Sequence, residues 1–325
     1  MKVLRREFLH LAAAVAALPT LACPARAQSY PARPLRLIVG YPAGGSTDLV
    51  ARIMGAWLAE RLGQSVVIEN KPGAGTNLAV QAAVASPPDG YTLLFVTTTN
   101  AINASFHAAL PFDFLRDLAP VAAFVELPFV MEVNPSVPAK TVAELIAHAK
   151  ATPGKINAAS FGTGTISHMA WELFKLMAGI EMVHVPYHGG APMVTDLIGG
   201  RVQAGIDALP NSLAHIRSGA LRALALTGPA RSAAVPDVPT VGETLTGYEV
   251  SGWTGIAVPA GTPAAVIAML NREINAGLAH PRIAARLAEV GGRPIQVTAD
   301  QFGDLWRRDT DKWAKVMTFA AGNRE

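Results

Sequence analysis

Short apolar runs alternate with amphipathic segments along most of the chain, and turns rich in glycine, proline, serine and threonine separate them. The apolar runs predict strands at 35–39, 65–69, 91–96, 124–133, 156–160, 182–185, 202–206, 221–227 and 253–258. Helical spacing predicts helices that end at Gly63, Ala85 and Gly179, with others over 142–150, 192–198, 263–279, 281–290 and 300–317. This repetition is typical of α/β folds with mostly parallel sheets.

The first three predicted strands all run into loops of small and hydroxyl-bearing residues. These loops are 41–48 (YPAGGSTD), 70–76 (NKPGAGT) and 97–100 (TTTN). In open α/β sheets, ligands bind at the carboxyl ends of the strands. We therefore expect a binding site where these loops meet.

The order of elements predicts two domains. Strand, loop and helix repeat within 127–252, whereas 253–325 offers one strand and three helices with no strand-helix units of its own. These last helices are expected to cover the first sheet. The predicted division is 28–126 with 253–325 as domain 1 and 127–252 as domain 2, joined by two crossovers that form a hinge.

The first 27 residues resemble a secretory leader. Lys2, Arg5 and Arg6 precede an apolar run over 9–22 that ends at Ala25-Arg26-Ala27, which predicts cleavage after Ala27 and an exported protein. The Arg5-Arg6 pair also fits a twin-arginine signal. The alternatives are an uncleaved amphipathic anchor and, through Cys23, a lipoprotein, which Thr20 three positions earlier disfavours.

Composition excludes several classes of protein. The chain has 27 basic and 24 acidic residues, and removal of the leader leaves 23 of each, which gives no basic footprint for nucleic acid. The single cysteine lies in the leader, so the mature chain has no disulfide and no cysteine-ligated zinc. No other apolar run is long enough to span a membrane.

Two loops have the form of an anion site. Gly44-Gly45-Ser46-Thr47 and Gly162-Thr163-Gly164-Thr165 both precede predicted helices, where free amides and the helix dipole favour negative charge. Hydroxyls in and beside these loops, including Ser167, are further donors. The alternative for each loop taken alone is an ordinary helix cap with a glycine turn.

Enzyme and metal motifs fail at specific residues. Leu78 and Ser167 stand where two dinucleotide-type glycine motifs need a third glycine, and no phosphate loop or nucleophile elbow is present. Pro186 prevents His184 and His188 from sharing a helical face, so no metal and no cofactor is expected. His168, at a helix start, is a candidate donor to a ligand carboxylate, with a structural histidine as the alternative. Tyr187 and Asp207 stand at strand ends that face the proposed site, and Asp207 has a helix cap as its alternative.

In this order, the loops resemble the substrate-binding proteins of the tripartite tricarboxylate transporter family, the Bug receptors. The resemblance runs from about Tyr30 to Met317 and rests on 42–48 (PAGGSTD), 69–75 (ENKPGAG), 117–120 (DLAP), 162–168 (GTGTISH), 185–189 (VPYHG), 205–207 (GID), 252–255 (GWTG) and 260–263 (AGTP). It implies a type II periplasmic binding fold of two α/β domains that holds a small carboxylate. His188 departs from the family pattern, because many relatives have lysine there.

The resemblance also implies a set of ligand contacts and partners. The expected contacts are Tyr41, Ala43, Gly44, Gly45, Ser46, Thr47, Asp48, Asn70, Thr98, Thr99, Phe161, Gly162, Thr163, Gly164, Thr165, Ser167, His168, Tyr187 and Asp207. The expected role is a monomeric, non-enzymatic periplasmic receptor that delivers a di- or tricarboxylate, acidic amino acid or aromatic acid to large and small membrane subunits. The alternatives are an exported serine hydrolase that uses Ser46 or Ser167 with His168, and a sensory subunit that presents ligand to a histidine kinase.

Overall fold

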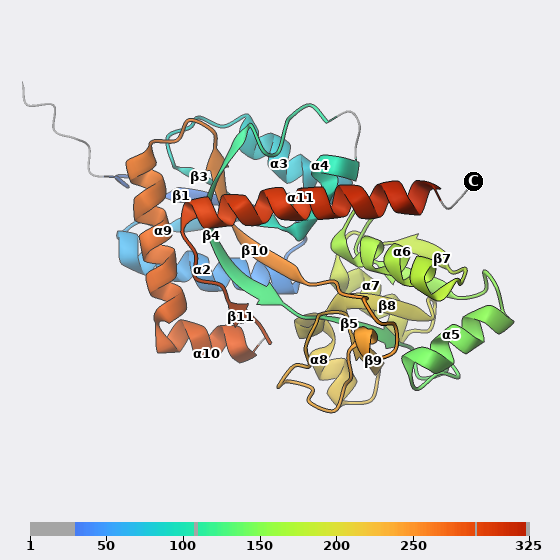
Figure 1. The fold of residues 1–325 in the computed structure, drawn as a ribbon. Coiled ribbons are helices and arrows are strands. Elements are labelled where there is room, and N and C mark those ends of the chain that lie inside the picture. The colour runs from blue at the N-terminus through green and yellow to red at the C-terminus, as the bar shows by residue number, and fades with distance from the viewer. Residues whose placement is uncertain (1–29, 107–109, 290, 323–325) are drawn as a thin grey trace, which may run out of the picture. The chain divides into compact units, whose positions relative to one another are not determined.

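The computed structural model describes residues 30–106, 110–289 and 291–322, and the predicted leader lies outside these ranges. Residues Arg33–Glu325 belong to one compact unit, and Met1–Ala32 to another. The fold described below is that of the larger unit (Figure 1).

The first sheet has six strands in the order β11-β4-β10-β3-β1-β2. Their bounds are β1 Leu35–Val39, β2 Val66–Asn70, β3 Thr92–Thr97, β4 Leu118–Leu127, β10 Gly252–Pro259 and β11 Arg293–Pro294. Strand β1 pairs in parallel with β2 and β3, and β10 is antiparallel to both β3 and β4. Strands β1 to β4 therefore share one direction, and β10 and β11 run the other way.

The second sheet has five strands in the order β7-β6-β8-β5-β9. Their bounds are β5 Phe129–Val133, β6 Asn157–Ser160, β7 Val183–Pro186, β8 Ala204–Ala208 and β9 Arg222–Leu226. Strand β6 pairs in parallel with β7 and β8, whereas β5 is antiparallel to β8 and β9. We call the first sheet with its helices lobe 1 and the second sheet with its helices lobe 2.

Helices cover both sheets. Lobe 1 carries α2 Ser46–Leu62, α3 Asn77–Val84, α4 Thr98–Phe106, α9 Ala264–Ala279, α10 Pro281–Glu289 and α11 Ala299–Gly322, and lobe 2 carries α5 Val142–Ala151, α6 Ile166–Ala178, α7 Gly190–Ile198 and α8 Leu209–Arg217. Two short 3₁₀ turns lie at Ala74–Thr76 and Val241–Glu243. In lobe 1, α2 packs against α9. Residues of α3, α4 and α11 contribute to a separate apolar core with the strands of the first sheet.

The apolar run over 124–133 contains the predicted domain boundary at 126/127, and the structure divides this run into two strands. Strand β4 ends at Leu127 in the first sheet, Pro128 follows, and β5 begins at Phe129 in the second sheet. Proline lacks the N–H that would continue the ladder, so the chain leaves one sheet and enters the other there. The return passes through Ser251 into β10, whose Gly252 lies opposite Leu127. The exact domain boundaries stay a prediction.

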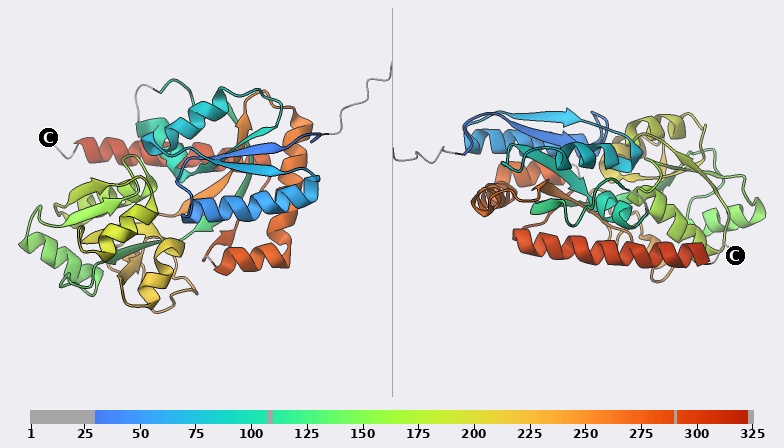
Figure 2. Two further views of the ribbon diagram at one scale, coloured as in Figure 1. Left: turned by 180° about the vertical axis from the view of Figure 1, so that it is seen from behind. Right: turned by 90° about the horizontal axis from the view of Figure 1, so that it is seen from above.

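Helix α11, one of the C-terminal helices expected to cover the first sheet, packs on β4 and α4 of lobe 1 and also reaches lobe 2. Its Trp306 packs in the core of lobe 1, but Trp313 belongs to the core cluster of lobe 2. Figures 1 and 2 show α11 extending from the elements of the first sheet toward α6, which it contacts. Both tryptophans are buried on one face of the helix, as their spacing of seven predicts, but Trp306 packs in the core of lobe 1 and Trp313 in the core of lobe 2.

Candidate anion-binding site

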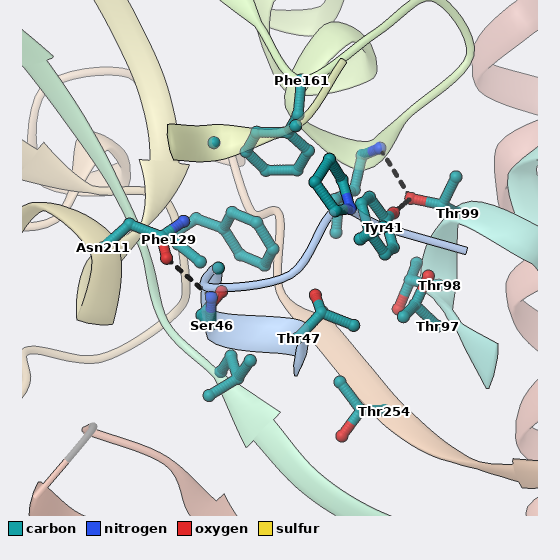
Figure 3. Close-up of a pocket in the computed structure, with 18 of the residues that line it drawn as sticks. Tyr41, Ser46, Thr47, Thr97, Thr98, Thr99, Phe129, Phe161, Asn211 and Thr254 are labelled. Atoms are coloured by element: carbon teal, nitrogen blue, oxygen red, sulfur yellow. Dashed lines mark hydrogen bonds between the residues drawn. The ribbon is translucent and has the colours of Figure 1, made fainter. Parts of the chain in front are cut away.

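A small cavity lies where the loops of the two lobes meet (Figure 3). We call it the central cavity; it has a volume of about 50 Å³. One ordered water needs roughly 10–15 Å³ on this measure, so the cavity is small and nearly closed. Its lining residues come from both lobes: Tyr41, Pro42, Ala43, Gly45, Ser46, Thr47, Thr97, Thr98, Thr99, Leu127, Phe129, Phe161, Ile166, Gly189, Gly190, Ala191, Ala208, Asn211, Gly252, Trp253 and Thr254.

Five helix N-termini reach the wall of the central cavity. The lining includes the first residues of α2, α4, α6 and α7, and Ala208, which caps α8. The first amides of a helix have no acceptor within the helix, and each N-terminus carries roughly half a positive charge. None of the described residues that line this cavity is Asp, Glu, Lys, Arg or His. The positive potential of the wall therefore comes from the backbone.

The two glycine loops are built differently. Helix α2 begins after Gly45 and has no side-chain cap, whereas the Thr165 side chain caps α6 and accepts a hydrogen bond from the His168 amide. The first loop therefore offers no hydroxyl of its own to its helix amides, and the Ser46 amide bonds instead to Asn211 Oδ1 from the other lobe. In the second loop, the Thr165 hydroxyl already accepts a hydrogen bond from one of the first amides of its own helix, as in an ordinary cap.

Asp48 holds the first loop in shape. Its carboxylate accepts hydrogen bonds from the Gly44 amide, Arg52 and Asn70, and Asn70 also donates to the Tyr41 carbonyl. Burial raises the pKa of Asp48, but the bonds from Arg52, Gly44 and Asn70 outweigh it and hold this pKa below its usual value. Asp48, Asn70 and Gly44 thus support the central cavity from behind without lining it.

Thr97, the last residue of β3, forms a hydroxyl wall with Thr98 and Thr99, the first residues of α4. Thr99 Oγ1 accepts hydrogen bonds from the Tyr41 hydroxyl at 3.0 Å and from the Ile166 amide at 3.3 Å, and Thr98 Oγ1 accepts one from the Trp253 amide. Burial raises the pKa of Tyr41, which stays protonated as a donor. Sequence analysis expected 97–100 to be a loop, but α4 begins at Thr98. This adds one more N-terminus to the cavity.

Aromatic rings fill the space between the polar groups. Tyr41 and Phe161 meet edge to face with centroids 6.5 Å apart, and Phe129 lies 6.0 Å from Phe161. Figure 3 shows these rings between Asn211 on one side and the threonine wall on the other. A ligand in the central cavity would contact donors and aromatic surface together.

A larger outer cavity of about 340 Å³ adjoins the central cavity. The two share Tyr41, Pro42, Phe161 and Gly189. Of the expected contacts, Gly162, Thr163, Thr165 and Tyr187 line the outer cavity, as does His188. The second glycine loop thus faces the first mainly through this outer cavity, and only its flanking Phe161 and Ile166 reach the central one.

Gly164, Ser167 and His168 are three more expected contacts that line neither cavity. Ser167 Oγ donates to the Ile206 carbonyl at 2.5 Å. His168 lies 3.4 Å from Glu172 and stacks on His184 with centroids 4.0 Å apart. Gly164 donates to His168 Nδ1. Ser167 and His168 therefore have other partners, and the hydrolase alternative has no nucleophile and base in contact here.

His184 and His188 are separated, in agreement with the break that Pro186 predicts. His184 lies 2.7 Å from Ser160 Oγ, and burial together with neighbouring His168 lowers the pKa of His184 to about 4. His188 lines the outer cavity instead. Among the residues that the structure describes, no group of three His, Cys, Asp or Glu side chains is placed to hold a metal ion.

Asp207 lies directly behind the central cavity in a buried acidic pair with Glu132. Ser212 Oγ lies 2.7 Å from Glu132 Oε1 and 3.3 Å from Asp207 Oδ2. One hydroxyl hydrogen cannot serve both carboxylates, so the pair needs a further proton. Burial, with repulsion from Asp207, raises the pKa of Glu132, and burial raises that of Asp207 to about 7.

This pair predicts a pH dependence of stability. The folded pair keeps a proton that the unfolded chain loses near pH 4, so its contribution falls as pH rises from about 4 through about 7. We expect Glu132→Gln to gain stability relative to the wild type on going from pH 5 to pH 8, by roughly 1–3 kcal/mol. Thermal unfolding at the two pH values measures this.

The matched control is Glu289→Gln, because Glu289 is exposed. Its difference from the wild type is expected to be the same at both pH values. An equally flat difference for Glu132→Gln would contradict a shared buried proton.

Asn211 is the polar residue of the site that sequence analysis did not single out. It lies in α8, for which the sequence analysis gave no bounds, and its side chain reaches the first turn of α2 in the other lobe. The available signal was its position four residues after Asp207, one helical turn beyond a strand end.

Comparison with known proteins agrees with this architecture. The family model described as "Tripartite tricarboxylate transporter family receptor" matches residues 50–320. The chain is also 39% identical to Protein BugT of Bordetella pertussis over 302 residues, which cover 91% of this chain and 92% of BugT. The chain belongs to the tripartite tricarboxylate transporter receptor family.

Solved structures of similar proteins confirm the fold expected for this family. The R. palustris protein Rpa4515 with adipate is 34% identical, with a TM-score of 0.87 over 90% of this chain and 98% of that one. MatC from Rhodopseudomonas palustris with bound malate is 30% identical, with a TM-score of 0.84 over 88% and 99%. The resemblance found in the sequence and the two-domain α/β fold class are thereby confirmed.

Proposed function

We propose that this receptor binds a small carboxylate in the central cavity, in the periplasm, and delivers it to a membrane transporter. The observation that carries the proposal is the convergence of five helix N-termini on a cavity whose described lining residues include no charged side chain. Backbone amides and partial helix charges attract a carboxylate, and the Ser and Thr hydroxyls add donors. Acidic side chains that would repel the anion are absent from the described lining.

The bound ligands of two solved relatives support a carboxylate. One of these proteins was solved with adipate and the other with malate, and both match this chain over most of its length. Adipate is long and apolar in its middle, whereas malate is short and hydroxylated. The aromatic rings between the polar groups of this site suit ligands with an apolar middle.

We assign direct contact first to the residues that line the central cavity, namely Tyr41, Ala43, Gly45, Ser46, Thr47, Thr98, Thr99 and Phe161. Gly162, Thr163, Thr165 and Tyr187 are proposed to contact the part of a longer ligand that extends into the outer cavity. Gly44, Asp48, Asn70, Gly164, Ser167, His168 and Asp207 are proposed to act through the residues that they position.

The delivery step is proposed from the family. The partners would be the large and small membrane subunits of a tripartite tricarboxylate-type transporter, with this chain acting as a monomer after export and cleavage at Ala27. Twin-arginine export through Arg5-Arg6 is part of the same proposal. In the described part of the chain, no helix has the length and apolar character that a bilayer crossing requires.

A panel of acids tests ligand capture. We expect at least one of adipate, malate, citrate and benzoate to raise the unfolding temperature, since a ligand at 100 times its Kd adds about 2.7 kcal/mol to stability. The neutral amide of the same acid should give a much smaller shift. Calorimetric titration then measures the affinity. Absence of both a thermal shift and binding heat across the panel would reject carboxylate capture.

A further inference from the structure

The side chain of Asn211 joins the two lobes at the N-terminus of α2. The Ser46 amide donates to Asn211 Oδ1 at 2.8 Å, although the two residues are 165 positions apart. Figure 3 shows this bond at the edge of the central cavity, below Phe129. Ser46 is the first residue of a 17-residue helix, so its amide is one of the strongest backbone anion donors in the site.

The orientation of the Asn211 amide is set from behind. Its Nδ2 donates to Asp207 Oδ1 at 2.8 Å, and Asp207 is fully buried. A rotated amide would direct its NH₂ at the Ser46 N–H and its oxygen at the Asp207 carboxylate, which removes both bonds. Asn211 therefore presents an acceptor to Ser46.

Close packing keeps the amide in this place. Gly190, the first residue of α7, lies so near that a Cβ there would come within 2.4 Å of Asn211 Nδ2 and 2.8 Å of Asp207 Oδ1. Only glycine leaves room for the Asn211–Asp207 pair at this point. Asn211 is thus part of the wall of the central cavity, and the fully buried Asp207 supports it from behind.

The side chain also has a place to go when it leaves Ser46. Asn211 and Ala191 also line a third cavity, distinct from the central and outer cavities, of about 400 Å³. Its other lining residues are Gly44, Val194, Thr195, Ile198 and His215. Rotation of Asn211 toward this space would free the Ser46 amide without moving the backbone of α8. The wall can therefore open at this residue alone.

We propose that Asn211 is an affinity-determining latch: its side-chain carbonyl occupies the Ser46 amide across the lobes, and a ligand carboxylate binds there by displacing it. This inference rests on the proposed carboxylate function and names the residue that opposes binding. A carboxylate makes a stronger, charge-assisted bond to the amide than a neutral carbonyl does, so the exchange favours the ligand. The free energy needed to break the bond between Asn211 and Ser46 weakens the binding free energy of every ligand that takes the Ser46 amide.

Two measurements on Asn211→Ala test the latch. Amide hydrogen exchange of Ser46 in the protein without added acid is expected to become about fivefold faster. Adipate, or malate if adipate gives no heat, is expected to bind about fivefold more tightly, which corresponds to roughly 1 kcal/mol for one net hydrogen bond. The matched control is Asn275→Ala in α9, whose amide is bonded within lobe 1 and should alter neither measurement.

The outcomes separate this inference from the proposed function. Unchanged Ser46 exchange overturns the latch, and so does equal or weaker acid binding by Asn211→Ala, which would make Asn211 a ligand contact or a bystander. If the wild type binds neither acid, the titration is repeated with citrate and benzoate; if it binds none of the four, carboxylate capture is what fails, and the Ser46 exchange rate alone decides the latch.

Discussion

Replacing Thr47 by aspartate is expected to weaken carboxylate binding at least about 100-fold while leaving the fold intact. Thr47 lies in the first turn of α2 and lines the central cavity, where it is partly exposed. A second negative charge about 4–5 Å from the ligand costs roughly 3–4 kcal/mol at an effective dielectric constant near 20. An aspartate in a first helical turn is itself favourable by about 0.3–1 kcal/mol, so the free protein should keep its stability.

The control is Thr47→Asn, because asparagine has the same shape as aspartate but carries no charge. We expect Thr47→Asn to retain affinity within about tenfold of the wild type, since it removes only a hydroxyl donor. Calorimetric titration with the acid that gives the largest thermal shift measures both variants, and thermal unfolding without ligand checks the fold. Equal affinities for the aspartate and asparagine variants would show that no anion binds beside α2.

Gly255→Ala is expected to destabilise the protein by about 3 kcal/mol, even though it adds a single methyl group. A Cβ at this position would lie 2.4 Å from the Ala122 carbonyl oxygen of β4 and 2.4 Å from the Phe302 ring of α11. The carbonyl belongs to a paired strand and cannot move aside, so the excess volume strains the core. The unfolding temperature should fall by roughly 5–10 °C.

The control for this substitution is Gly228→Ala, because a Cβ there would meet nothing within 4 Å. Its unfolding free energy should stay within about 0.5 kcal/mol of the wild type. Denaturant unfolding of both variants gives the comparison. A stable Gly255→Ala variant would mean that β4 and α11 can separate at this point.

Local pattern was sufficient to predict most of the fold. The strand, glycine turn and amphipathic helix of 35–62 follow from residues that are close in sequence, and β1 and α2 form as expected. The same holds for the unit that ends at Gly179, where a left-handed glycine closes α6. Periodicity alone does not divide the apolar run over 124–133, whose halves lie in different sheets; the order of the elements, which put the predicted domain boundary at 126/127, was the signal there.

The site was predicted in outline and missed in detail. Hydroxyl-rich loops at strand ends were sufficient to locate Ser46, Thr47, Thr98 and Thr99 on the cavity. The second glycine loop looks equivalent in sequence, yet Thr165 caps its own helix and the loop faces the outer cavity. Asn211 acts across 165 residues, and no local pattern reveals such a bond.

The position of Trp253 gives the receptor an intrinsic optical reporter. Trp253 is one of the residues that line the central cavity, while its indole Nε1 donates to Asp309 of α11 at 2.5 Å and its ring stacks on Trp306 with centroids 6.3 Å apart. None of the other tryptophans, Trp57, Trp171, Trp306 and Trp313, lines the cavity as the structure describes it. Indole emission depends on nearby polar groups and on water, so occupancy of the cleft can be followed by fluorescence without any attached dye.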